Sequence, residues 1–90
     1  YALSPQDSAE APESRLKRVL REFTRSIEAA GQFIVIKTPP SGAQPVGRAL
    51  DHSGIQEIAG TIAGDDTVFV LIRSANLSPG VLSRLKVLAS

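Results

Sequence analysis

The sequence predicts an α+β domain of element order ββαββα, with two helices packed on one face of a mainly antiparallel four-stranded sheet. Runs of β-branched and other apolar residues at 33–37 and 67–73 are bounded by turn residues and indicate strands. Apolar positions spaced by three and four residues near the C-terminus, at 81, 82, 85 and 88, indicate a helix. Since 90 residues leave room for a single domain, both halves of this pattern should share one core.

The N-terminal residues 1–14 are rich in Ala, Ser, Pro and acidic side chains, without an apolar period. This composition is typical of a linker or a disordered tail, which places the folded domain at residues 15–90. Apolar residues from Leu16 to Ile27 then recur at helical spacing, while Phe23, Arg25 and Ile27 alternate as in a strand. We expect a short helical turn at 13–21 followed by a strand at 22–28.

A hairpin should follow, because the turn residues 29–32 separate this strand from a β-branched run at 33–37. The sheet cannot continue through Pro39 and Pro40, which lack backbone N–H donors. A helix is expected next, with an apolar face at Val46, Ala49 and Leu50 and its end at Gly54. Ser41 and Gln44 have the spacing of a capping box at its start.

The third strand is expected at 57–63, with Ile58, Gly60 and Ile62 on one face. Its other face would carry the small residues Ala59, Thr61 and Ala63, which indicates that another element packs closely against it. After a turn at 64–66, the almost wholly apolar fourth strand at 67–73 should occupy the centre of the sheet. Ser78 is expected to cap the last helix, with Pro79 at the first helical position.

The composition excludes several classes of protein. Ten basic against nine acidic residues give a net charge of +1, so we expect the segment alone to bind DNA poorly. The absence of cysteine and the single histidine argue against disulfides and the usual zinc sites. The longest apolar run, Val68–Ile72, is too short to span a bilayer, and no signal peptide opens the chain. A cytoplasmic protein without membrane contacts is therefore expected.

The adjacent carboxylates Asp65 and Asp66 occupy a glycine-containing turn between two apolar strands. Such side chains often cap backbone N–H groups of a hairpin loop, which is one interpretation. The other is a cation site, because a cation relieves the repulsion between the two carboxylates and a guanidinium can bind carboxylate oxygens in pairs. A metal is the rival cation, but calcium normally takes about six or more oxygen ligands, which this turn does not provide.

A longer pattern around this turn resembles a known family. The run GTIAGDDT at 60–67 follows IKTPP at 36–40, and GAQ at 42–44 leads to ALD at 49–51. Over roughly residues 23–88 this pattern resembles the C-terminal domain of bacterial arginine repressors. The resemblance implies a domain that forms trimers, which stack into hexamers, with L-arginine bound between trimers as co-repressor and no other cofactor. It also implies that operator DNA is bound by an N-terminal winged-helix domain, which is absent from this chain.

The resemblance assigns six residues to L-arginine and no metal ligands. Asp65, together with Asp66, is expected to hold the guanidinium of an arginine seated mainly in a neighbouring subunit. Gln44, Asp51, Thr61 and Ala63 are expected to contact the rest of the ligand, particularly its α-amino and α-carboxylate groups.

Each of the last four residues also has a structural interpretation. Gln44 has capping-box spacing, and Thr61 and Ala63 are small strand residues that permit close packing. Asp51 lies near the expected C-terminal end of a helix, where the macrodipole disfavours a carboxylate. An ammonium partner would account for that position, and so would solvation or pairing with Arg48.

The functional prediction is an arginine-responsive transcription regulator of arginine metabolism, and not an enzyme. The alternatives are a small α+β enzyme and a ligand-free oligomerisation module. No set of acid, base and nucleophile surrounds His52, which argues against the enzyme. A basic cluster at 15, 17, 18 and 21 is interpreted as a solvated helix face or as a contribution to DNA approach.

Overall fold

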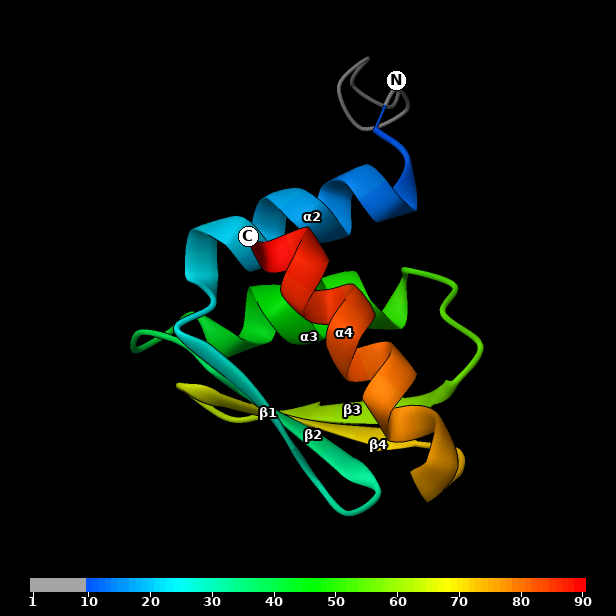
Figure 1. Cartoon of the computed structure of the whole chain (residues 1–90). Helices are drawn as coiled ribbons and strands as arrows, with labels where there is room; N and C mark the ends of the chain where they lie inside the picture. The colour runs from blue at the N-terminus through cyan, green and yellow to red at the C-terminus, as the bar shows by residue number, and fades with distance from the viewer. Residues whose placement is uncertain (1–9) are drawn as a thin grey trace.

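The computed structural model describes residues 10–90, which form a four-stranded sheet with three α-helices on one side of it (Figure 1). The sheet consists of β1 (Ser26–Ala30), β2 (Phe33–Lys37), β3 (Ile58–Ala63) and β4 (Thr67–Ile72), in the spatial order β1-β2-β4-β3. The helices are α2 (Pro12–Phe23), α3 (Ala43–Asp51) and α4 (Ser78–Ala89), with a 3-10 turn, η1 (Ala75–Leu77), before α4. All three strand pairs are antiparallel, which confirms the predicted α+β class and the central position of the apolar strand β4.

The helix α2 is longer than the sequence predicted, and the strand after it begins later. The helix spans Pro12–Phe23 and ends where the N–H of Thr24 donates to the carbonyl of Leu20. The expected strand at 22–28 was therefore wrong in its first four residues. Apolar residues between 16 and 27 fit both a helical and a strand-like spacing. The helical spacing is correct up to Phe23, because it buries Leu16, Val19 and Leu20 on one face of α2. The predicted tail lies outside the described residues at 1–9, and the helix starts within its last three positions.

The helices form two layers above the sheet. The helix α3 covers β3 and β4, α4 covers β1 and β2, and α2 packs across α3 and α4 (Figure 1). Leu20, Ile34, Ile36, Val46 and Leu85 are completely buried where these layers meet. Each fully buried side chain of this kind contributes about 1.5–3 kcal/mol. Among residues 10–90, no helix has the length and apolar character that a membrane span requires.

The segment before α3 differs from the predicted capping box. Gly42 is the N-cap residue, no side chain caps the helix, and Ser41 has a φ of 69°. In that left-handed conformation the Ser41 N–H donates to Oδ1 of Asp65, 3.2 Å away. The backbone N–H of Ala43 donates to the carbonyl of Asp65. The start of α3 is thus satisfied by the β3–β4 turn, and the predicted capping by Ser41 and Gln44 was wrong.

A β-bulge changes the two faces of β3. Ile58 pairs with Ile72 and Gly60 with Leu71, so Ala59 is an extra residue in the register. Ile58, Thr61 and Ala63 therefore face the helices, while Ile62 faces away from them and is 75% exposed. The predicted common face of Ile58 and Ile62 was wrong, because strict alternation does not survive the inserted residue.

The last helix also begins differently from the prediction. Leu77 is the N-cap residue, Ser78 is already helical and Pro79 lies in the first turn. The buried Ser78 hydroxyl donates to the carbonyl of Gly31, 3.2 Å away, rather than to its own helix. This bond attaches the start of α4 to the β1–β2 turn.

Candidate functional site

A hollow of about 320 Å³ lies between α3 and β3 and contains most of the residues singled out in the sequence. Four of the six, Gln44, Asp51, Thr61 and Ala63, line this hollow. Gly47, Arg48 and His52 complete the lining. Residues up to 19 positions apart in the chain thus meet because α3 lies directly on β3.

The close approach of α3 to β3 depends on small residues. A Cβ placed on Gly47 would lie 3.1 Å from the Cβ of Ala63 and 3.8 Å from Oγ1 of Thr61. The first distance is shorter than an ordinary van der Waals contact between carbon atoms, which is about 3.5–4.0 Å. Gly47 is buried, so a side chain there would require α3 or the neighbouring Ala63 to shift by a few tenths of an ångström. This confirms that an element packs closely on the small residues of β3.

Asp51 occupies the last position of α3 and is exposed. Its Oδ1 accepts a hydrogen bond of 2.7 Å from the Thr61 hydroxyl. Within residues 10–90 Asp51 forms no ion pair, and in particular none with Arg48. The predicted alternative of an Arg48 partner was therefore wrong, and the carboxylate retains acceptor positions toward the hollow.

Gln44 lies one helical turn before Gly47 and Arg48, and its side chain reaches the end of β3. Its amide nitrogen Nε2 donates to the carbonyl of Ala63 at 2.9 Å and more weakly to that of Gly64 at 3.5 Å. The amide oxygen remains available as an acceptor at the rim of the hollow. Pro45, the next residue, is in the first turn of α3, where proline is tolerated.

Asp65 and Asp66 are exposed at the β3–β4 turn and do not line the hollow. The carboxylate of Asp65 accepts the Ser41 N–H, and the carboxylate of Asp66 accepts the Thr67 hydroxyl at 3.0 Å. Lys37 donates its Nζ to the same Thr67 hydroxyl at 3.0 Å, which places a cation near the turn. Backbone capping therefore occupies one oxygen of Asp65, and the second oxygen of that carboxylate is not used in this way.

The sequence interpretation did not include Gly47, Arg48 and His52 in the site. A signal for them was present, because residues 44, 47, 48, 51 and 52 lie at helical spacing along one face of α3. His52 follows the helix and its Nδ1 lies 2.9 Å from the carbonyl of Arg48. It thus fixes the end of α3 beside the hollow.

The hollow combines a carboxylate, a hydroxyl, a primary amide and a guanidinium within a few side chains. A carboxylate binds an ammonium group, whereas amide and guanidinium N–H groups bind a carboxylate. The hollow therefore suits a small zwitterion. In the part of the chain that is described, no group of three or more His, Cys, Asp or Glu side chains is placed to hold a metal ion.

The sequence of this chain matches one family of known proteins over most of its length. The family model for the arginine repressor C-terminal domain matches residues 20–87. An arginine repressor of Symbiobacterium thermophilum is 43% identical over 86 residues, which cover 96% of this chain and 57% of that protein. Arginine repressors of Thermotoga maritima and Bacillus subtilis are each 40% identical over 85 residues, 94% of this chain and 56% of theirs. The chain thus spans somewhat more than half the length of these relatives.

Proposed function

We propose that this chain, which belongs to the arginine repressor family and corresponds to its C-terminal domain, binds L-arginine and assembles the repressor. Its relatives are named arginine repressors, and a repressor is a regulator rather than an enzyme. In this proposal the whole protein represses genes of arginine metabolism in the cytoplasm, with L-arginine as co-repressor and no metal. A winged-helix domain outside this sequence would bind the operator.

The observation that carries the proposal is the meeting of Gln44, Asp51, Thr61 and Ala63 at one hollow. In the proposed complex Asp51 accepts hydrogen bonds from the α-ammonium group of arginine, and its bond from Thr61 fixes the orientation of the carboxylate. Gln44 contributes its amide oxygen, which its bonds to Ala63 and Gly64 leave free, as a second acceptor for the α-ammonium group, and the backbone of Ala63 borders the ligand. These roles use the charge complementarity of a zwitterion and the groups described above.

The guanidinium group requires a second carboxylate, and the distribution of residues supports a site shared between subunits. Asp65 and Asp66 do not line the hollow of their own chain. A neighbouring copy that brings its β3–β4 turn to the hollow would supply the missing anion, with Asp65 binding the guanidinium through two parallel hydrogen bonds. Asp66 would strengthen the local negative potential.

A second surface supports self-association. We call the apolar residues on the helix-free side of the sheet, of which Val35 is half-buried and the others are exposed, the open sheet face: Phe33, Val35, Ile62, Phe69 and Leu71. Phe69 is 50% exposed and its ring centroid lies 6.1 Å from that of Phe33. Contiguous apolar surface of this kind marks interaction sites. We propose that this face joins subunits into trimers, and that the arginine sites lie between two trimers in a hexamer.

Binding and assembly are then linked. Arginine that contacts two subunits binds the assembled form more tightly than the separated one, so it shifts the equilibrium toward assembly by the same coupling free energy. The hexamer would present several DNA-binding domains at once and raise their effective concentration on paired operator sites.

Calorimetric titration of this chain with L-arginine tests the proposal. Saturable heat with a defined ligand-to-chain ratio is expected, together with a much weaker response to citrulline, whose urea group lacks the guanidinium charge. The alternative of a ligand-free oligomerisation module predicts no saturable heat from either ligand. That result would contradict the proposed function.

A further inference from the structure

The helix α2 is basic, although the net charge of the whole chain is close to zero. Residues 12–25 contain five basic and two acidic side chains, although the whole chain has a net charge of only +1. The apolar side of α2 is buried against α3 and α4, so the charged side faces solvent. Ser14, Lys17, Arg18, Arg21 and Glu22 line a shallow hollow of about 520 Å³ on that side.

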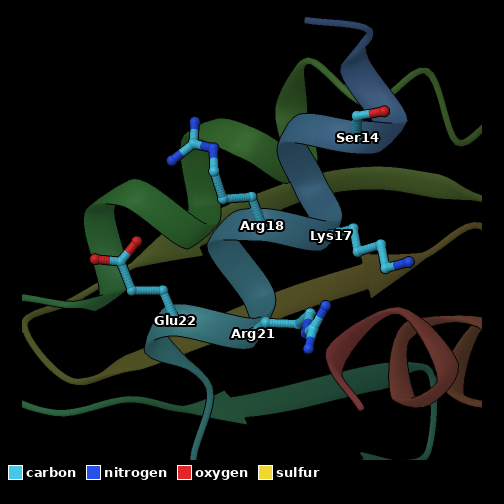
Figure 2. Close-up of a pocket in the computed structure, with 5 residues that line it drawn as sticks. All are labelled: Ser14, Lys17, Arg18, Arg21 and Glu22. Carbon is cyan, nitrogen blue, oxygen red and sulfur yellow. The ribbon is translucent and has the colours of Figure 1, made fainter.

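Lys17 and Arg21 are one helical turn apart, and Figure 2 shows both side chains extending to the same side of α2. Arg18 and Glu22 extend to the other side in that view. Side chains at this spacing are neighbours on a helix surface, with Cβ atoms about 5–6 Å apart. Two cations in this position repel each other unless an anion lies between them.

Two of the acidic groups on or beside α2, Glu10 and Glu13, are paired, and the third, Glu22, extends away from Lys17 and Arg21 (Figure 2). Glu10 accepts two hydrogen bonds from Arg18, at 2.9 and 3.1 Å, and these bonds lower the pKa of the Glu10 carboxyl. Glu13 accepts a hydrogen bond of 3.0 Å from Arg84 on α4. Within residues 10–90, neither Lys17 nor Arg21 has an ion-pair partner. The cationic pair is therefore available to an external anion.

We propose that Lys17 and Arg21, with the Ser14 hydroxyl beside them, bind backbone phosphates of duplex DNA. The ammonium group acts as a point charge toward a phosphate, the guanidinium can bind two phosphate oxygens, and the hydroxyl adds a donor. Such contacts position a protein on DNA without reading its sequence. The inference rests on the proposed function, which makes the whole protein a DNA-binding repressor.

Two features favour DNA over the other large anions. The apolar side of α2 belongs to the core, so the helix has no apolar face to insert into an anionic membrane. The helix also lies on the opposite side of the molecule from the open sheet face (Figure 1), so subunits joined through that face leave α2 accessible. An assembled repressor would present one such cationic pair on each subunit.

Fluorescence anisotropy with a short labelled DNA duplex, at a series of salt concentrations, tests the inference on this chain. The parent is expected to bind weakly at about 50 mM salt. The logarithm of its binding constant should fall linearly with the logarithm of the salt concentration. The double variant Lys17→Gln with Arg21→Gln should bind about tenfold more weakly at low salt. The slope of its salt dependence should be shallower by the amount that corresponds to about two phosphate contacts per chain.

The matched control is Lys86→Gln with Arg73→Gln, which removes the same charge from exposed positions outside α2. It should keep most of the parent affinity. Equal losses in the two double variants, or no salt-dependent binding by the parent, would overturn the inference. So would variant-sensitive binding to anionic phosphatidylglycerol vesicles in place of DNA.

Arginine titration of the same α2 variant separates the two proposals. If this variant binds both arginine and DNA as the parent does, only the proposed phosphate site is refuted and the proposed function stands. A parent that does not bind arginine refutes the proposed function, whatever the DNA result. Circular dichroism of both double variants verifies that these exposed substitutions leave the fold intact.

Discussion

The Thr61 hydroxyl donates a hydrogen bond of 2.7 Å to Oδ1 of Asp51 and so connects the middle of β3 to the last residue of α3. The bond gives the carboxylate a fixed orientation although the residue is exposed. It also offsets the unfavourable position of a negative charge at a helix C-terminus. In the proposed complex, this pair holds the α-ammonium group of arginine.

Replacement of Thr61 by valine tests that role. Valine has nearly the same shape but no hydroxyl, so Asp51 loses a hydrogen bond of the kind worth about 1.5–3 kcal/mol when one partner is charged. We expect arginine affinity to fall about tenfold or more, because about 1.4 kcal/mol corresponds to one decade. Thr61→Ser keeps the hydroxyl and should bind within about threefold of the parent. Isothermal titration measures the arginine affinity of both variants. Equal arginine affinities of Thr61→Val and Thr61→Ser would refute the role of the Thr61 hydroxyl.

A substitution at Gly47 tests the close contact of α3 with β3. Gly47→Ala adds a methyl group 3.1 Å from the Cβ of Ala63. Overpacking costs about 1–3 kcal/mol and exceeds the gain of about 1 kcal/mol from better helix propensity. We expect a lower Tm, by up to about 8 °C for each kcal/mol in a domain of this size.

Gly80, in the first turn of α4, is the matched control for Gly47. A Cβ placed on Gly80 meets no atom within 4 Å. Gly80→Ala should therefore leave the free energy of unfolding unchanged or raise it, by at most about 1 kcal/mol. Thermal unfolding followed by circular dichroism compares the two variants. If Gly47→Ala is as stable as Gly80→Ala, α3 and β3 do not pack as described.

The open sheet face is tested by a charge at its centre. Phe69 is paired in register with Val35 on one side and Ile62 on the other, and it contacts Phe33. Phe69→Lys should prevent self-association, because an interface that buries an unpaired charge is destabilised by several kcal/mol. Val87→Lys on α4 is the control, since Val87 is 71% exposed on the opposite side of the molecule. Sedimentation at micromolar concentration should show smaller assemblies for Phe69→Lys alone, and a monomeric parent would contradict the proposed interface.

Local patterns predicted much of the fold. The bounds of β2 follow from its β-branched run between two turns, and β4 is central because nearly every residue in it is apolar. The transition from α2 to β1 was predicted incorrectly, because apolar residues there fit both helical and strand periods. Burial of Leu16, Val19 and Leu20 against the other helices selects the helix, and that contact is not local in the sequence.

Parts of the candidate site could likewise be predicted from the sequence, and other parts depend on how the elements pack. The positions of Asp51 and Thr61 within their elements follow from the sequence, but the hydrogen bond between them requires the packing of α3 on β3. The bulge at Ala59 decides which face of β3 carries Thr61 and Ala63, and an inserted residue leaves little trace in an alternating pattern. The cap at Ser41 was mispredicted because the partner of the α3 start is Asp65, a residue 24 positions away.

Titration of Asp65→Asn with L-arginine, beside the parent, determines whether the aspartate turn recognises the guanidinium of the ligand. Asparagine retains an oxygen that can accept the Ser41 N–H, so the fold should be preserved. Removal of one partner of a desolvated ion pair costs about 3–5 kcal/mol, which corresponds to a loss of roughly two to three and a half decades in affinity. We predict that loss, together with unchanged thermal stability in the absence of arginine. Binding by Asp65→Asn within about threefold of the parent, a difference below about 1 kcal/mol, would show that the aspartate turn is not the guanidinium site.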